Sequence, residues 1–239
     1  MNWRSFAYTI PTMISSGNTK GLLSGAVRRF YSDRTDLLLQ RDMSQPVEIP
    51  SARIPISIRP ITEADFRRVA LEVPDRIGVL KSGIPTCYLG ITDSNKICYM
   101  QWLIDASQNH SRPQAISWRL APDAMLLEWA YTFRDFRGLG VMSCAMAQIL
   151  KEAQQRHARF VYTIVERSNI ASLKGCRNVG FRPHRVRKEK WRMLHQSQHY
   201  EPLVEAAGYP FEIADSRNYE PTRVSQRIQL NDDALRIDK

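Results

Sequence analysis

The chain has 239 residues, of which 43% are hydrophobic and 24% charged, and its net charge is +10. This length allows one large domain, or a domain with extensions, that buries about 70% of its unfolded surface. No apolar run approaches the roughly 18 residues that a transmembrane helix needs, so we expect no membrane span. The four cysteines, Cys87, Cys98, Cys144 and Cys176, lack the spacing of a metal site. We therefore expect free, buried thiols and no bound metal.

The positive charge is concentrated in the middle of the chain. Residues 51–195 carry 23 basic and 12 acidic residues, whereas residues 196–239 carry five basic and eight acidic residues. A polyanionic ligand is therefore expected in the central block. Nucleic acid and a phosphate-rich cofactor both fit this distribution.

The N-terminal part is expected to lie outside the main domain. Residues 1–32 contain no Asp or Glu, a composition that resembles a transit peptide. The alternative is an amphipathic extension whose apolar residues recur at helical spacing, namely Leu22, Leu23, Ala26, Val27 and Phe30. Pro46, Pro50 and Pro55 then indicate an extended stretch. We therefore predict that residues 1–50 are an N-terminal extension and linker.

Apolar periodicity predicts the remaining elements. A short strand over 54–59, a helix capped by Thr62, and a hairpin of residues 87–91 and 97–104 come first. A strand over 125–133, a helix over 139–156, a strand over 160–165, a helix over 169–179 and a last strand or hairpin over 181–194 follow. This order indicates a mixed α/β sheet. Residues 196–239 are predicted to be an acidic, partly disordered C-terminal tail.

One segment predicts a binding site. A strand that ends at Thr132 and Phe133 is followed by a glycine turn, and a helix begins at Val141. Glycines let the backbone approach a ligand closely, and the N–H groups of a first helical turn attract anions. The segment therefore predicts a phosphate-binding turn.

Two motifs in this order resemble the GCN5-related N-acetyltransferase superfamily. Its first motif, Arg/Gln-x-x-Gly-x-Gly/Ala, reads Arg137-Gly138-Leu139-Gly140-Val141-Met142 in this chain. The second begins at Asn169, contains Ser172 and ends with Gly180-Phe181, and Cys176 stands where many members have Tyr. The resemblance covers about residues 54–194.

The resemblance implies a fold and a cofactor. The fold is the acyl-CoA N-acyltransferase fold, an α/β domain with a mixed, mostly antiparallel sheet flanked by helices, here over residues 51–195. Backbone amides of the first motif would hold the pyrophosphate of acetyl coenzyme A (acetyl-CoA). The implied cofactor-binding residues are Thr132, Phe133, Arg137, Gly138, Leu139, Gly140, Val141, Met142 and Asn169.

Two residues are candidates for catalysis. Glu128 is the only carboxylate in the strand before the glycine turn, and a positioned carboxylate can accept the proton of an attacking amine. Because side chains alternate along a strand, we expect Glu128 to share a face with Ala130 and Thr132. An exposed or salt-bridged Glu is an equally good interpretation. The Cys176 thiol could protonate the departing thiolate, although its apolar neighbours favour packing.

The sequence therefore predicts a cytoplasmic, acetyl-CoA-dependent N-acetyltransferase that acts on a small-molecule or protein amine. A transferase of longer acyl groups is an alternative. A non-catalytic module that senses coenzyme A (CoA) or binds nucleic acid is another, although we do not expect nucleic acid as the partner. The identity of the amine and the existence of a homodimer stay open.

Overall fold

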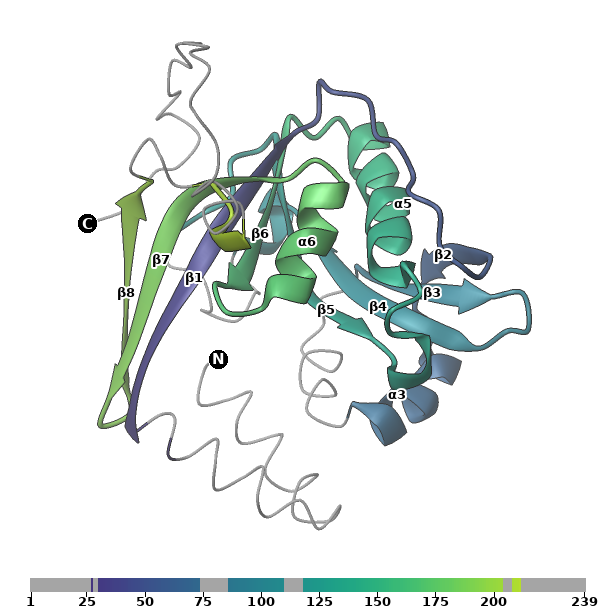
Figure 1. The fold of residues 1–239 in the computed structure, drawn as a ribbon, viewed down its shortest axis with the longest axis horizontal. Helices are drawn as coiled ribbons and strands as arrows, with labels where there is room; N and C mark the ends of the chain where they lie inside the picture. The colour runs from purple at the N-terminus through teal and green to yellow at the C-terminus, as the bar shows by residue number, and fades with distance from the viewer. Residues whose placement is uncertain (1–26, 28–29, 74–85, 110–117, 204–207, 212–239) are drawn as a thin grey trace.

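The computed structural model describes residues 27, 30–73, 86–109, 118–203 and 208–211. Eight strands form one sheet in the order β2-β3-β4-β5-β6-β1-β7-β8 (Figure 1). The strands are β1 (Tyr31–Asp42), β2 (Ile56–Pro60), β3 (Cys87–Thr92), β4 (Ile97–Ile104), β5 (Ala124–Thr132), β6 (Phe160–Glu166), β7 (Arg182–Arg192) and β8 (His195–Pro202). Six of the seven strand pairs are antiparallel, and β5 and β6 are parallel. The predicted mixed, mostly antiparallel sheet is confirmed.

Helices cover both faces of this sheet. The helices are α3 (Phe66–Glu72), α5 (Val141–Gln155) and α6 (Ile170–Asn178), with short 3-10 turns at Glu63–Asp65, Ala106–Asn109 and Arg134–Phe136. One core lies between the sheet and α5 and α6, and a second core, which includes Val69 of α3, lies on the opposite face. In the described part of the chain, none of the helices has the length and apolar character needed to cross a membrane.

Helix α5 shows why the predicted elements from the hairpin onward were correct. Its residues Val141, Ala145, Ile149 and Ala153 recur every fourth position, and all four are buried in the core under α5 and α6. This spacing places them on one face of the helix. The β3–β4 hairpin and the β6–α6 unit were likewise predicted from their apolar patterns.

Residues 31–42 correct the predicted N-terminal boundary. They form β1, which lies inside the sheet between β6 and β7, so they are not part of an extension or linker. Leu37, Leu38 and Leu39 are buried there. The strand was missed because charged residues surround this short apolar run. The transit-peptide interpretation applies to residues 1–32, of which residues 1–26, 28 and 29 lie outside the described residues.

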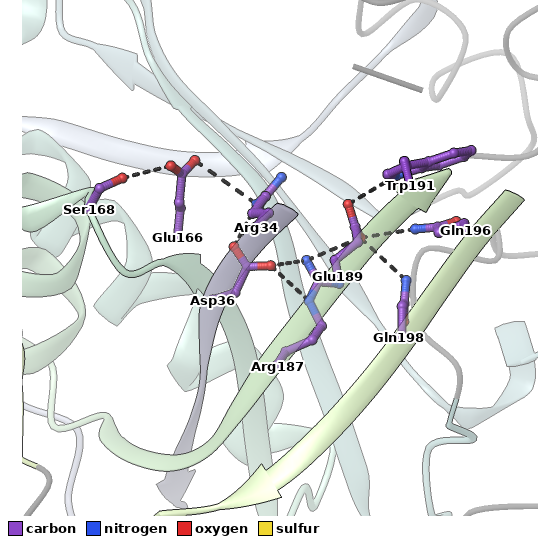
Figure 2. A network of polar contacts seen from close by, with 9 residues as sticks. All are labelled: Arg34, Asp36, Glu166, Ser168, Arg187, Glu189, Trp191, Gln196 and Gln198. Carbon is purple, nitrogen blue, oxygen red and sulfur yellow. Dashed lines mark hydrogen bonds and ion pairs between the residues drawn. The ribbon is translucent and has the colours of Figure 1, made fainter. Parts of the chain in front are cut away.

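A buried ion pair explains how β1 tolerates a charge inside the sheet. Asp36 is fully buried, and it accepts hydrogen bonds from Nε and Nη2 of Arg187 in β7 and from Nε of Arg34. The network continues to Glu189, which accepts hydrogen bonds from Trp191, Gln196 and Gln198 (Figure 2). A buried charge is costly unless it is paired, so this network makes the central position of β1 possible.

The C-terminal boundary is also different from the prediction. Residues 195–202 form β8, the edge strand paired with β7, so they belong to the sheet and not to a tail. Tyr209 is buried as well, and its hydroxyl donates to the carbonyl oxygen of Phe181 at 2.7 Å. Residues 212–239, the rest of the predicted tail, lie outside the described residues.

Candidate functional site

Strand β5 contains a β-bulge in its middle. Two of its residues, Trp129 and Ala130, lie opposite the single residue Gln101 of β4. Trp129 has a φ of 54°, in the left-handed region that bulky residues rarely adopt. Bulges bend a strand and redirect its side chains, and they are common beside active sites.

The bulge coincides with the point where β5 and β6 separate. The two strands pair only over Ala124–Leu127 and Phe160–Thr163. Beyond this point β5 continues to Thr132 and β6 to Glu166, and the ribbons diverge (Figure 1). Beyond these paired residues, the N–H and C=O groups of β5 and β6 that face each other are not hydrogen-bonded between the two strands. These groups can therefore bind an extended ligand.

The bulge also places Glu128 on an unexpected face. Its cross-strand partner Trp102 belongs to the core on the α3 side, whereas Tyr99, the partner of Thr132, belongs to the core under α5 and α6. Because cross-strand partners share a face, Glu128 and Thr132 lie on opposite faces. The predicted common face was wrong, since the extra bulge residue reverses the alternation. Glu128 is half-buried.

The two glycines of the turn have different environments. Both have left-handed backbone, with φ of 74° at Gly138 and 76° at Gly140. A Cβ added at Gly140 would lie 3.1 Å from the carbonyl oxygen of Ser51, whereas one at Gly138 would have no atom within 4 Å. A side chain at Gly140 would therefore crowd the backbone of Ser51, whereas Gly138 borders open space.

Helix α5 begins directly after this turn. Gly140 is its N-cap residue, and the first turn has neither a side-chain cap nor an acidic residue. The first N–H groups of a helix have no acceptor within it, and the helix dipole favours an anion at this end. The amides of Val141, Met142 and Ser143 are therefore suited to a phosphate group.

Arg137 adds positive charge beside the turn. Its Nε donates to the carbonyl oxygen of Thr132 at 3.1 Å, and its guanidinium lies 5.5 Å from the ring centre of Tyr131. The exposed Arg137 side chain thus links the turn to the end of β5. Phe133 is buried, and its N–H donates to the carbonyl oxygen of Cys98 at 3.1 Å. The Phe133 N–H therefore already has a hydrogen-bond acceptor within the sheet.

Met142 points toward α6. Its sulfur lies 3.0 Å from the position that a Cβ on Gly175 would take, and the neighbouring Ser143 hydroxyl donates to the Gly175 carbonyl oxygen at 3.3 Å. The absence of a side chain at Gly175 therefore makes room for the large residue at position 142. The phosphate-binding turn does not have to accommodate it.

Comparisons with known proteins bear on the fold. The sequence matches no protein-family model, and no curated protein matches it significantly. A solved GCN5-related glucosamine N-acetyltransferase region of a fungal multi-domain beta-N-acetylglucosaminidase superposes with a TM-score of 0.56 at 14% identity. The chain has the GCN5-related N-acetyltransferase fold. The match covers 74% of this chain and 23% of the fungal one. A Drosophila protein matches with a TM-score of 0.50 at 12% identity, over 72% of this chain and 55% of that one.

The second motif has clear local roles within this N-acetyltransferase fold. The Asn169 side chain accepts a hydrogen bond from the Ser172 N–H at 3.2 Å and caps α6. Cys176 is fully buried in the core under α5 and α6, and burial raises the pKa of its thiol to about 12. The thiol is therefore protonated at neutral pH. All four cysteines are free and buried.

Tyr200 is a residue on the face of Glu128 that the sequence did not indicate. It lies in β8 opposite Arg187 and packs against the core on the α3 side, which is the face of Glu128. Burial raises the pKa of its phenol, Arg187 lowers it, and the charge of Glu128 raises it by a smaller amount. Residues 195–202 contain few apolar residues, so their sequence predicted a tail.

Proposed function

We propose that this protein is an acetyl-CoA-dependent N-acetyltransferase that transfers an acetyl group directly to an amine. The observation that supports this best is the divergence of β5 from β6, followed at once by the glycine turn and the N-terminus of α5. Open space next to Gly138 fits a phosphate group there. We further propose a cytoplasmic location and a small-molecule or protein amine as acceptor.

The roles of the residues follow from their places. The amides of Val141, Met142 and Ser143 would hold the pyrophosphate, with Arg137 adding positive charge. Thr132, Leu139 and Asn169 would border the same ligand. Acetyl-CoA supplies the thioester. Glu128, on the opposite face of the sheet, would accept the proton that the acceptor ammonium must lose.

The function can be tested by measuring free thiol released from acetyl-CoA as amines are added, with mass spectrometry of the product. Amine-dependent thiol release and an acetylated amine are expected. Faster reaction with a longer acyl-CoA would instead assign a different acyl donor. CoA binding without turnover over a broad amine panel would contradict the enzyme and support a sensor, and salt-sensitive retention of DNA or RNA would support a nucleic-acid-binding module.

A substitution at Gly138 tests the phosphate-binding turn. Gly138→Val is expected to raise the dissociation constant of CoA at least about tenfold, or about 1.4 kcal/mol, because its side chain would enter the proposed phosphate position. Calorimetric titration with CoA measures this. Gly138→Ala and Gly140→Ala share the left-handed backbone, but only the second meets Ser51, so it should lower the melting temperature more. Unchanged affinity in folded Gly138→Val would remove Gly138 from the site.

Cys176 is expected to act in packing. Cys176→Ala should therefore retain most of the turnover and lose about 1–2 kcal/mol of stability. Cys176→Tyr should be less stable than wild type by about 1–3 kcal/mol, because the site is fully buried beside Leu173 and Val179. Turnover assays and urea unfolding measure these effects. A hundredfold loss of turnover in a folded Cys176→Ala variant with normal CoA affinity would show that the thiol takes part in the reaction.

A further inference from the structure

Exposed apolar side chains gather at one end of the sheet, where β1 begins and where β7 turns into β8. Five residues line a hollow of about 520 Å³ there, namely Val27, Phe30, Tyr31, Met193 and Leu194. They are five of the eight large hydrophobic residues that are exposed in the described part of the chain, and Met193 is 76% exposed. We call these five residues the hairpin tip. An exposed apolar cluster of this kind typically marks a protein or membrane contact.

The turn at the hairpin tip has an unusual sequence. Met193 and Leu194 form the two-residue loop between the paired residues Arg192 and His195. Their φ angles are 47° and 68°, in the left-handed region where such turns strongly prefer Asn-Gly. Two bulky apolar residues are therefore placed in solvent at a position where the backbone disfavours them.

The tip is nevertheless held firmly. The Met193 N–H donates to the carbonyl oxygen of Phe30 at 2.8 Å, which joins the turn to the start of β1. Arg192 lies over the Tyr31 ring, 3.9 Å from its centre, and pairs with both carboxylate oxygens of Asp33 at 2.8 and 2.9 Å. These contacts therefore fix the turn that carries the apolar side chains to the start of β1.

Positively charged side chains flank the turn of the tip. Lys190, two residues before Arg192, is exposed on β7, and Arg192 directly precedes the turn. Arg192 pairs with Asp33, and the exposed Lys188 farther along β7 pairs with Glu201. An apolar tip with an exposed lysine beside it complements an anionic lipid surface, where acyl chains accept the apolar groups and headgroups attract the cation.

We propose that the hairpin tip docks onto an anionic lipid bilayer, with Met193 and Leu194 inserted and Lys190 at headgroup level. A second copy of the chain fits less well, because a stable protein interface uses about 20–30 residues a side, and the tip offers five. A bilayer requires no matching shape, so few side chains are sufficient. This inference is independent of the proposed acetyl transfer.

Co-sedimentation of the full chain with vesicles tests the proposal. Binding is expected to vesicles of phosphatidylcholine with a quarter phosphatidylglycerol, and to be weaker for phosphatidylcholine alone and at high salt. Met193→Asn with Leu194→Gly should lower the partition coefficient at least about tenfold, because it removes the inserted groups. Since Asn-Gly suits this turn, the melting temperature of that variant should not fall.

Leu71→Gln is the matched control. Leu71 is 88% exposed on α3, away from the tip, so removing it should leave vesicle binding unchanged. Equal binding by the Asn-Gly variant and wild type, or no wild-type binding to anionic vesicles, would overturn the proposal. So would lipid-free dimers, seen by sedimentation velocity, that the Asn-Gly variant abolishes, because a second copy would then cover the tip.

Discussion

Glu128→Gln is expected to lower the turnover number by about 10²- to 10⁴-fold at neutral pH while CoA affinity stays the same. The substitution keeps the shape of the side chain and removes the charge that accepts a proton. The deficit should shrink at alkaline pH, because more of the acceptor amine is then already neutral. Steady-state kinetics with the true acceptor between neutral and alkaline pH measure both effects.

Glu48→Gln provides the matched control for this experiment. It is the same change at an exposed side chain in the segment between β1 and β2, which the proposed site does not use. It should leave turnover nearly unchanged. A carboxylate that only binds a cationic acceptor would raise the Michaelis constant of Glu128→Gln and leave its turnover number alone. Full turnover by Glu128→Gln would exclude Glu128 as the base.

Arg187→Met is expected to lower the free energy of unfolding by about 3–5 kcal/mol, because it leaves Asp36 buried without its main partner. Both side chains are nearly inaccessible, with exposed fractions of 6% for Arg187 and 0% for Asp36. Replacing both residues with apolar ones, as in Arg187→Met with Asp36→Leu, should recover much of this loss, because no uncompensated charge remains. Urea unfolding measures both variants.

The neighbouring ion pair offers a control on the same strand. Lys188 pairs with Glu201 at 2.7 Å, and both side chains are well exposed. Exposed pairs contribute little, so Lys188→Met should change stability far less than Arg187→Met. Equal losses for the two variants would mean that the burial of the Asp36–Arg187 pair is not what makes it important.

Most of the fold was predictable from local pattern. A pattern within a few consecutive residues is enough to predict helix α5, the β3–β4 hairpin and the turn at Gly138. Strand β1 could not be recognised in this way, because the residue that makes Asp36 acceptable inside a sheet is Arg187, which is 151 positions away. Strand β8 has few apolar residues and depends on β7 for its pairing.

The candidate site likewise contains features that depend on local sequence and features that depend on strand pairing. The glycine turn and the start of α5 were placed by sequence, because φ angles and helix ends are local properties. The face of Glu128 was not, because a bulge is defined by the pairing of two strands. Two β5 residues opposite Gln101 become visible only when the register with β4 is known. The electrostatic interaction of Tyr200 with Glu128 likewise requires the complete sheet.

The central place of β1 has a consequence for the order in which the protein assembles. The strand is synthesised early, but its partners β6 and β7 begin only at Phe160 and Arg182. A nascent chain that does not yet include these residues contains β1 without either neighbouring strand. Its Asp36 then has no Arg187 with which to pair. Pairings so distant in sequence are slow to form, because a long loop must close before any contact stabilises it. The complete sheet can therefore form only after nearly the whole domain has been synthesised.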